Sequence, residues 1–331
     1  MRQLAKRWLA AALLCGAAPA LAQAPGQPSA VLPRDCDRAC LIGLARSYMA
    51  ALAGHAPGQA PLAPRARFTE NDVEIPIGMG LWRSIDRVAT TAMEAADPDT
   101  GQAAWFGVVW EHGQPAIYAM RIHATGRRID EVETVVHRKT GLPAPFGDVD
   151  HLVHDPAFNE VLPTEQQRPR ERLIAVAQGY FNTVELNDGT VFTPFAEDCA
   201  RLENGISTTA PARPTAGAPG NAATIAAGCE AQFKLGIYRI NKRVRERRFP
   251  LVDTERGIVV ATGFFDHANG FDHYRLTNGA EMKTALKWPN SITLLEAFRI
   301  TDGRIQRIEA VFTYVPYFMH NPWATPAGGQ P

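Results

Sequence analysis

The sequence predicts an α+β protein built from two diverged copies of one unit, which span residues 35–138 and 170–323. Two observations support this class. Segments of the first half recur in the same order in the second half, and each copy begins with helical apolar periodicity and ends in long alternating strands. Helices followed by an antiparallel meander are typical of α+β folds and not of a parallel, doubly wound sheet.

The internal repeat consists of five matched pairs of segments. They are 44–49 with 176–181, 70–73 with 203–206, 97–101 with 253–257, 119–122 with 297–300, and 129–135 with 305–311. The separation between partners grows from 132 to 178 residues along the chain and is 176 at the last pair. The second copy should therefore contain two insertions, at 207–228 and 268–290.

Long strands are expected at the end of each copy, joined by hairpin turns at Gly126 and at Asp302-Gly303. The predicted strands are 103–111, 115–124 and 128–138 in the first copy, and 247–253, 257–267, 291–301 and 304–315 in the second. Segment 139–169 is rich in proline and has no regular period, so we expect a linker that runs over the surface.

The N-terminus has the features of a secretory signal peptide over residues 1–22. Basic residues come first, an apolar stretch without charges follows, and the small residues Ala20 and Ala22 precede the expected cleavage site. The apolar stretch is shorter than the roughly 20 residues that span a bilayer. We therefore predict a periplasmic or secreted protein that is not held in a membrane.

Four cysteines remain after the signal peptide: Cys36, Cys40, Cys199 and Cys229. An even number of cysteines in an exported chain indicates disulfide bonds. Of the three possible pairings, Cys36–Cys40 with Cys199–Cys229 is favoured because each pair lies within one copy. A four-cysteine metal site is disfavoured because the tightly spaced C-x-x-C pairs of zinc sites are missing. No metal is therefore expected.

The mature chain has 31 basic and 34 acidic residues. A nucleic-acid partner would require clustered Lys and Arg, so this class of partner is not expected. The one basic run, 242–248, is interpreted as the exposed end of a helix that leads into a strand, with an anion site as the alternative.

Several segments resemble the nuclear-transport-factor-2-like superfamily, which includes SnoaL-type cyclases, ketosteroid isomerases and small dehydratases. The shared pattern is a helix, then Glu-Asn-Asp or Glu-Asn-Gly, then three long antiparallel strands. More narrowly, 36–41, 68–71, 247–253, 264–267 and 321–323 resemble a family of secreted fungal and bacterial proteins without an assigned function. The resemblance implies a cone in each copy, with helices wrapped on a curved sheet around an apolar pocket, but it implies no particular reaction. Single-unit members pair through their sheets, so this chain is expected to be a monomeric pseudo-dimer or a homodimer.

No nucleophile elbow, phosphate-binding loop, dinucleotide fingerprint or zinc-protease motif is present, so any catalysis should be acid–base chemistry in a closed pocket without a cofactor. Asp266 and His267 are the first candidates because they end an apolar strand. Neighbours on a strand face opposite sides, so only one of them should point into the cone. A histidine there would titrate near the working pH. Alternatively, the pair begins a turn.

Two further candidates are His273, in an insertion that should cover the pocket mouth or form a surface loop, and Glu203. Glu203-Asn204 recurs as Glu70-Asn71, which also fits a structural role in which the Asn side chain holds a turn or bulge. Aromatic residues expected to contact a ligand, or else to pack in the core, are Tyr180, Tyr274, Trp288 and Tyr314.

These features favour an exported, cofactor-free lyase, isomerase or cyclase acting on a small apolar molecule, with the working pocket in the second copy. A periplasmic binding protein for a small hydrophobic ligand is the alternative.

Overall fold

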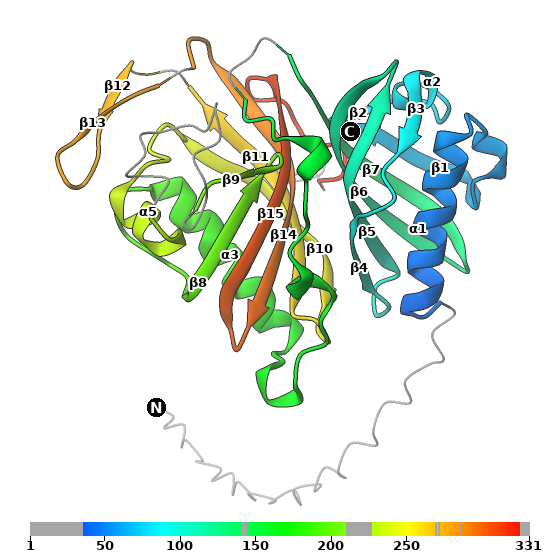
Figure 1. The fold of residues 1–331 in the computed structure, drawn as a ribbon, viewed down its shortest axis with the longest axis horizontal. Coiled ribbons are helices and arrows are strands. Elements are labelled where there is room, and N and C mark those ends of the chain that lie inside the picture. Colours follow the sequence, from blue (N-terminus) through cyan, green and yellow to red (C-terminus); the bar gives the residue numbers. More distant parts are fainter. Residues whose placement is uncertain are drawn as a thin grey trace, which may run out of the picture. The chain divides into compact units, whose positions relative to one another are not determined.

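The protein is described by a computed structural model that covers residues 36–140, 144–209, 227–268, 270, 272–284 and 286–324. It is a mixed α+β fold dominated by two curved sheets (Figure 1). The predicted signal peptide and most of the insertion at 207–228 lie outside the described residues. Within the described residues, no helix is long and apolar enough to cross a membrane.

The first sheet has the strand order β2-β1-β7-β6-β5-β3, with β4 also paired to β5. Its strands are β1 (Leu62–Glu70), β2 (Val73–Glu74), β3 (Ile85–Val88), β4 (Met93–Asp97), β5 (Gln102–Glu111), β6 (Gln114–Thr125) and β7 (Arg128–Arg138). The helices are α1 (Arg38–Ala53) and α2 (Leu81–Ser84), with a 3₁₀ turn at Pro57–Gln59. Helix α1 begins where the Asp37 carboxylate accepts the Cys40 amide at 2.9 Å.

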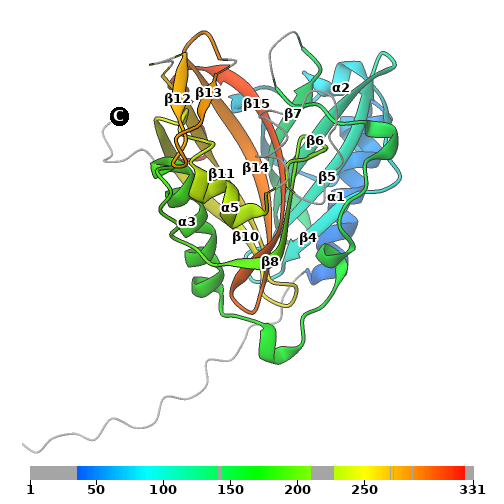
Figure 2. The ribbon, with the colours of Figure 1, turned by 60° about the vertical axis from the view of Figure 1, so that its left-hand side comes forward.

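The second sheet has the strand order β10-β11-β14-β15-β8-β9. Its strands are β8 (Phe195–Glu203), β9 (Ile206–Ser207), β10 (Arg243–Asp253), β11 (Ile258–His267), β14 (Asn290–Thr301) and β15 (Arg304–Pro316). Helices α3 (Arg170–Leu186) and α5 (Cys229–Leu235) lie on one face of it (Figure 2). A separate hairpin, β12 (His273–Arg275) with β13 (Glu281–Lys283), forms within the predicted insertion 268–290. The basic run 242–248 lies mostly in strand β10 and not at a helix end.

The two sheets have the same strand order when the second is read from β9 to β10. In each, the last strand pairs in parallel with the first strand and antiparallel with the strand before it. The glycine of the preceding strand is also equivalent, since Gly107 pairs with Tyr118 and Gly263 pairs with Leu294. The strand pairing within each sheet therefore shows which residue of one sheet is equivalent to which residue of the other.

This register corrects one of the sequence matches. Segment 119–122 was expected to correspond to 297–300, at a separation of 178 residues. The ladders instead match these strands at a separation of 176, so the expected match is out of register by two residues. A shift of two keeps every side chain on its own face of the sheet, which is why the apolar pattern hid the error. In the corrected register, Met120 corresponds to Glu296.

Buried side chains form three cores, because alternate residues of each strand point to opposite faces of its sheet. One core lies between α1 and the first sheet, and a second lies between α3, α5 and the second sheet. The third joins the other faces of the two sheets and consists of Met93, Ala95, Ala104, Phe106, Ile117, Ala119, Val135, Phe158, Leu251, Ile258, Val260, Leu295, Ala297 and Val311. On β6, Met120 belongs to the first core while its neighbour Ala119 belongs to the third.

Two reciprocal ion pairs link the halves. Arg38, at the start of α1, contacts the buried Asp253 of the second sheet at 2.6 Å, and Arg170, at the start of α3, contacts the buried Asp97 of the first sheet at 2.5 Å. Each arginine therefore neutralises a carboxylate of the other half, where an unpaired charge would be costly.

The Asn of the repeated Glu-Asn pair is structural in both halves. Asn71 (φ 51°) and Asn204 (φ 45°) adopt left-handed backbone conformations directly after β1 and β8. The Asn204 side chain accepts the Phe312 amide and donates to the Phe312 carbonyl, both at 2.9 Å, and Asn71 makes the same two bonds with Val136. Asn tolerates the left-handed conformation, and its side-chain amide hydrogen-bonds to the backbone of Val136 or Phe312 as a neighbouring strand would.

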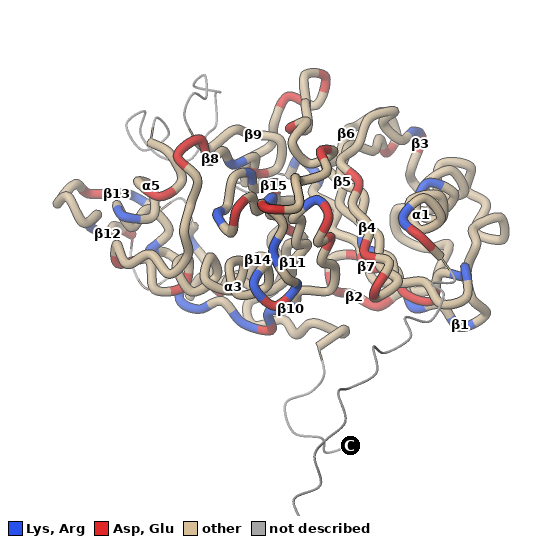
Figure 3. The backbone as a smooth tube through the Cα atoms, turned by 90° about the horizontal axis from the view of Figure 1, so that it is seen from below, with Lys and Arg blue, Asp and Glu red and all other residues tan. Residues whose placement is uncertain are grey.

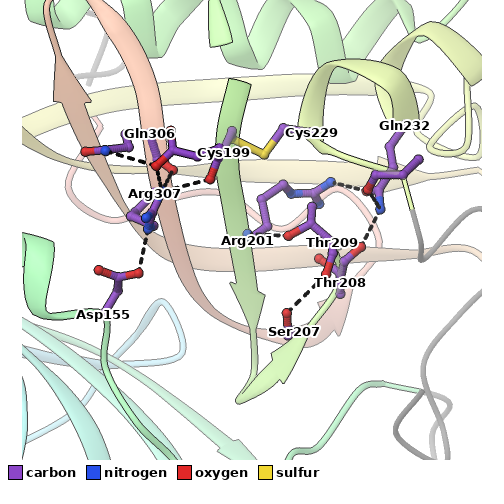
Figure 4. The surroundings of a disulfide bond; sticks show 12 residues. Asp155, Cys199, Arg201, Ser207, Thr208, Thr209, Cys229, Gln232, Gln306 and Arg307 are labelled. Atoms are coloured by element: carbon purple, nitrogen blue, oxygen red, sulfur yellow. Dashed lines mark hydrogen bonds and ion pairs between the residues drawn. A yellow bond between two sulfur atoms is a disulfide. The ribbon is translucent and has the colours of Figure 1, made fainter. Parts of the chain in front are cut away.

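Both disulfides have the pairing favoured by the sequence, Cys36–Cys40 and Cys199–Cys229. Cys199 lies on β8 and Cys229 begins α5, so this bond fixes α5 against the edge of the second sheet (Figure 4).

Candidate functional site

A cavity of about 240 Å³ lies inside the second half, between α3, the inner face of the second sheet and the β12–β13 hairpin. Its walls are mainly aliphatic and aromatic. Three of the four residues expected to contact a ligand, Tyr180, Tyr274 and Tyr314, line it, as do the catalytic candidates Glu203 and His267. Helix α3 supplies Tyr180, β8 supplies Glu203, and β11 and β15 supply His267 and Tyr314.

Glu296 is the most unusual group in this cavity. It lies on β14 in the run Leu294-Leu295-Glu296-Ala297-Phe298 and is 2% exposed. The Tyr180 hydroxyl hydrogen-bonds to the carboxyl group, but its Oε2 atom has no hydrogen-bond partner among the described residues. Burial raises the pKa of Glu296 to about 8, although the nearby Arg201 guanidinium opposes the shift. This carboxyl group is therefore mostly protonated near neutral pH.

A second group of polar side chains surrounds Arg201. Because side chains alternate between the two faces of a strand, Arg201 and Glu203 lie on the same face of β8. The buried Arg201 guanidinium donates to the Glu203 carboxylate and to the Tyr238 hydroxyl at 2.5 Å. It also donates to the Gln232 side chain at 3.0 Å (Figure 4). Burial holds the pKa values of Tyr180 and Tyr238 above their usual range, so both hydroxyl groups stay protonated. The negative charge of Glu203 offsets the positive charge of Arg201, which is the only arginine among the described residues that line the cavity.

His267 lies in the cavity wall with both ring nitrogens engaged. Nδ1 is 2.9 Å from Oδ1 of Asn290, and Nε2 is 2.7 Å from Oδ1 of Asn241. The Asn290 amide nitrogen donates to the Trp288 carbonyl, so its oxygen faces the ring and Nδ1 carries a proton. Burial lowers the pKa of His267. The ring is therefore clamped in the wall between two side-chain amides.

Asp266 points to the opposite face of β11, as expected for the neighbour of an inward His267. Its buried carboxylate contacts Arg245 at 2.8 Å and Arg243 at 3.2 Å, and it accepts the Ser291 hydroxyl at 2.6 Å. All of these partners lie outside the cavity, so the structure does not bring Asp266 to the other candidates.

The remaining candidates occupy the insertion. His273 is exposed on β12 and does not line the cavity, and Trp288 is 71% exposed, so neither is in reach of Glu296. Tyr274, in contrast, covers the cavity, with its hydroxyl donating to the Ile237 carbonyl at 2.7 Å. The insertion therefore covers the cavity through Tyr274 and Met282 and not through His273.

A larger hollow of about 620 Å³ adjoins the cavity. The two share six lining residues, Ile240, Asn241, His267, Tyr274, Thr284 and Leu286. Arg239, Lys242, His273 and Arg275 line only this outer hollow. Within the described part of the chain, no group of three or more His, Cys, Asp or Glu residues is arranged to hold a metal ion.

Three residues of the cavity, Arg201, Tyr238 and Glu296, were not identified from the sequence. A usable signal existed for Glu296, because it is the one carboxylate in an apolar strand and lies at even spacing from Leu294 and Phe298, which face inward. The incorrect register obscured it. Tyr238 follows α5 in an irregular turn, where no periodicity indicates direction.

A family model described as "Domain of unknown function (DUF8021)" matches residues 166–312. This range includes every strand of the second sheet except residues 313–316 at the end of β15. No curated protein matches the chain.

Among solved structures, the chain is similar to a Kribbella flavida protein provisionally assigned as a ketosteroid isomerase, with 18% identity, TM-score 0.27, and coverage of 36% of this chain and 92% of that one. It is also similar to a Methylobium petroleophilum protein of unknown function with a cystatin-like fold, with 16% identity, TM-score 0.24, and coverage of 32% and 81%. A designed protein with a curved β-sheet gives 14% identity, TM-score 0.26, and coverage of 30% and 87%. Each of these structures corresponds to about one third of this chain.

Proposed function

We propose that the protein is an exported, cofactor-free enzyme of the lyase, isomerase or cyclase type, which performs acid–base chemistry on a small, largely apolar molecule in the cavity of the second half. The observation that carries this proposal is the buried Glu296 carboxyl group, whose Oε2 atom faces an apolar cavity without a partner. Such a group is costly unless a ligand uses it. A carboxyl group with a pKa near the working pH is also suited to both proton donation and proton removal.

In the proposed reaction, Oε2 of ionised Glu296 removes a proton from a carbon next to a carbonyl group. The same carboxyl group then returns the proton to another atom of the substrate in an isomerisation, or to the leaving group in an elimination, so no oxidant or reductant is needed. Negative charge that develops on the carbonyl oxygen is stabilised by the field of Arg201, which acts strongly in a dry site. Glu203 and Tyr238 hold Arg201 in place.

We further propose that the two halves are tandem copies of one cone-shaped unit, of which only the second works on a ligand. The shared strand order, the equivalent Asn71 and Asn204 and the reciprocal Arg38 and Arg170 ion pairs support this. The chain would then be a pseudo-dimer in which the first half is a scaffold. The signal-peptide features and the two disulfides support export to the periplasm or the cell exterior.

Proton transfer is tested with methyl hexyl ketone in deuterium oxide, where incorporation of deuterium next to the carbonyl is followed by NMR. We expect exchange above the buffer rate, and a loss of about 100-fold or more in Glu296→Gln, which keeps the shape but removes the base. The matched control is Glu197→Gln, an exposed carboxylate of the same sheet that lines no part of this cavity, and it should exchange at the wild-type rate.

The outcome also separates the enzyme from a carrier. Tight binding of the ketone without exchange would contradict the enzyme and favour a binding protein for a small hydrophobic ligand. Equal exchange rates in wild type and Glu296→Gln would overturn the role of Glu296.

A further inference from the structure

The cavity and the outer hollow differ in charge. The inner cavity contains Glu296 and the compensated pair of Arg201 and Glu203, and the exposed Lys283 is its only other cationic lining residue among those described, apart from His267. It therefore offers no free cation at depth that could compensate a buried anion.

The outer hollow has the opposite character. Arg239, Lys242, His273 and Arg275 line it, with Glu185 as its one carboxylate among the described lining residues. Glu185 is already engaged, because its carboxylate contacts Arg247 at 2.7 Å and accepts the Val244 amide at 2.9 Å. The basic groups of the hollow are therefore in excess.

These basic groups are also largely free to bind. Among the described residues, Lys242 and Arg239 have no carboxylate within ion-pair distance, and the Arg239 guanidinium donates to the Arg275 carbonyl at 3.0 Å. Arg275 contacts Glu281 at 3.5 Å, but both side chains are more than 60% exposed, so water screens this pair. An anion that enters the hollow would meet several cations, with only the exposed Glu281 beside Arg275 and Asp188 near Arg239 as competing carboxylates among the described residues.

We propose that the outer hollow binds the anionic end of the substrate, so that the substrate is a small amphiphile with a neutral, carbonyl-bearing apolar part in the inner cavity and a carboxylate or phosphate group among Arg239, Lys242 and Arg275. This inference rests on the proposed function and names its substrate class. The six shared lining residues make the two compartments neighbours, and the charge difference sets the orientation of the ligand. Cations at an entrance also increase the encounter rate of anions.

Three probes with one body and different ends test the proposal: methyl hexyl ketone, the same ketone with a carboxylate at the far end of the chain, and the same ketone with a trimethylammonium group there. Binding is measured by isothermal titration calorimetry. We expect the carboxylate to bind about tenfold more tightly than the neutral ketone at low salt, and the advantage to shrink when the ionic strength rises from about 50 mM to about 500 mM. The ammonium probe should bind most weakly.

Removal of the cations should act on the charged probe alone. In the double variant Arg239→Gln and Lys242→Gln, the advantage of the carboxylate should disappear while binding of the neutral ketone stays unchanged. The control is Lys234→Gln, a lysine of α5 that lines neither compartment, which should keep the full advantage. Equal binding of the neutral and carboxylate probes, or tighter binding of the ammonium probe, would overturn the proposal.

Filling the inner cavity shows whether one ligand occupies both compartments. Leu294→Trp should abolish binding of the neutral and the carboxylate probes together, because Leu294 lines the inner cavity only. Survival of carboxylate binding in this variant would contradict the proposed orientation.

The two proposals fail separately. If the carboxylate probe binds with the expected charge dependence but no deuterium exchange occurs, the reaction is wrong and the anion site stands. If exchange depends on Glu296 but is indifferent to the charge of the tail, the reaction stands and the anion site is wrong.

Discussion

The interiors of the two halves share one strand order but differ in how completely side chains fill them. In the first half, the space between α1 and the sheet is filled by large side chains, including Tyr48, Trp82, Trp105, Tyr118 and Met120, all at most 4% exposed. The Trp82 indole donates to the Tyr48 hydroxyl at 3.1 Å, so even the polar atoms there are used internally.

Matched positions of the second half have smaller or charged residues. In the register of the ladders, Trp105 corresponds to Ala261, Tyr118 to Leu294, Met120 to Glu296 and Phe68 to Arg201. Of these, Leu294, Glu296 and Arg201 line the cavity, so one smaller side chain and two charged ones stand where the first half has Tyr118, Met120 and Phe68. The cavity thus coincides with a few differences between matched positions of the two sheets.

The repeated glutamate makes the same point. Glu70 accepts the Leu81 amide at the start of α2 at 2.7 Å and contacts Arg138 at 2.9 Å, and both partners are structural. Glu203 instead holds Arg201 at the cavity. One residue type at one position therefore stabilises a fold in the first half and orients a buried charge in the second.

The largest effect expected from exchanging the two interiors is that of Met120→Glu. This change places a carboxyl group in the filled first core, where no cation compensates it and no space admits water. We expect a loss of about 3–5 kcal/mol in the free energy of unfolding at neutral pH, measured by urea denaturation. Met120→Leu, which keeps the apolar volume, should cost less than about 1.5 kcal/mol. A mild effect of Met120→Glu would show that the first interior is not sealed.

The reverse change, Glu296→Met, should stabilise the protein while abolishing exchange. Because the folded-state pKa of Glu296 is raised to about 8 from 4.5, the folded state holds a proton that the unfolded state has lost between these pH values. Wild-type stability should therefore fall as pH rises through this window, and the variant should gain an advantage of about 2–4 kcal/mol by pH 8. Melting curves of both proteins from pH 4.5 to 8.5 check this, and parallel curves would contradict it.

A smaller pH effect is expected where the two sheets meet. Asp72 accepts the Thr293 hydroxyl, close to the contact between Arg248 and Glu133. Burial, with a contribution from Glu133, raises the pKa of Asp72 to about 7, so its ionisation costs stability as pH rises from about 4 to 7. Asp72→Asn keeps an acceptor for Thr293 and should gain about 1–2 kcal/mol at pH 8 but little at pH 4.

The effect of Asp72→Asn is measured by urea denaturation at the two pH values. Glu131→Gln, at a partly exposed carboxylate that contacts the nearby Arg121, is the control, and its effect should not show the same pH dependence. An Asp72→Asn effect that is the same at pH 4 and pH 8 would show that the carboxyl group is not desolvated.

Basic and acidic residues are interspersed along both halves (Figure 3), so local pairs and not a net field decide these effects. The carboxylates at issue differ only in what surrounds them. Asp97 and Asp253 are equally buried but each has an arginine, whereas Glu296 and Asp72 lack a full ion pair.

Local signals in the sequence predict the long strands correctly. Strand positions near 103–138 and 291–315 agree with β5 to β7 and with β14 and β15 within two residues, because alternation and turn residues are local features. The pairing of Cys199 with Cys229 was anticipated from the repeat. The register of β14 was misjudged because a shift of two residues preserves the alternation, and this shift hid the contrast between Met120 and Glu296.

The sequence by itself predicted the α+β class, the positions of the long strands, the favoured disulfide pairing and a structural role for Asn71 and Asn204 as one of two interpretations, because each depends on residue type and spacing along the chain. Only the tertiary structure decided that Glu296 and Arg201 meet in one cavity, that Asp266 turns away from it, and that His267 is clamped between two amides. Burial and unpaired hydrogen-bonding atoms depend on residues brought together from α3, β8, β11 and β14. No local pattern records which of those residues leave a space between them.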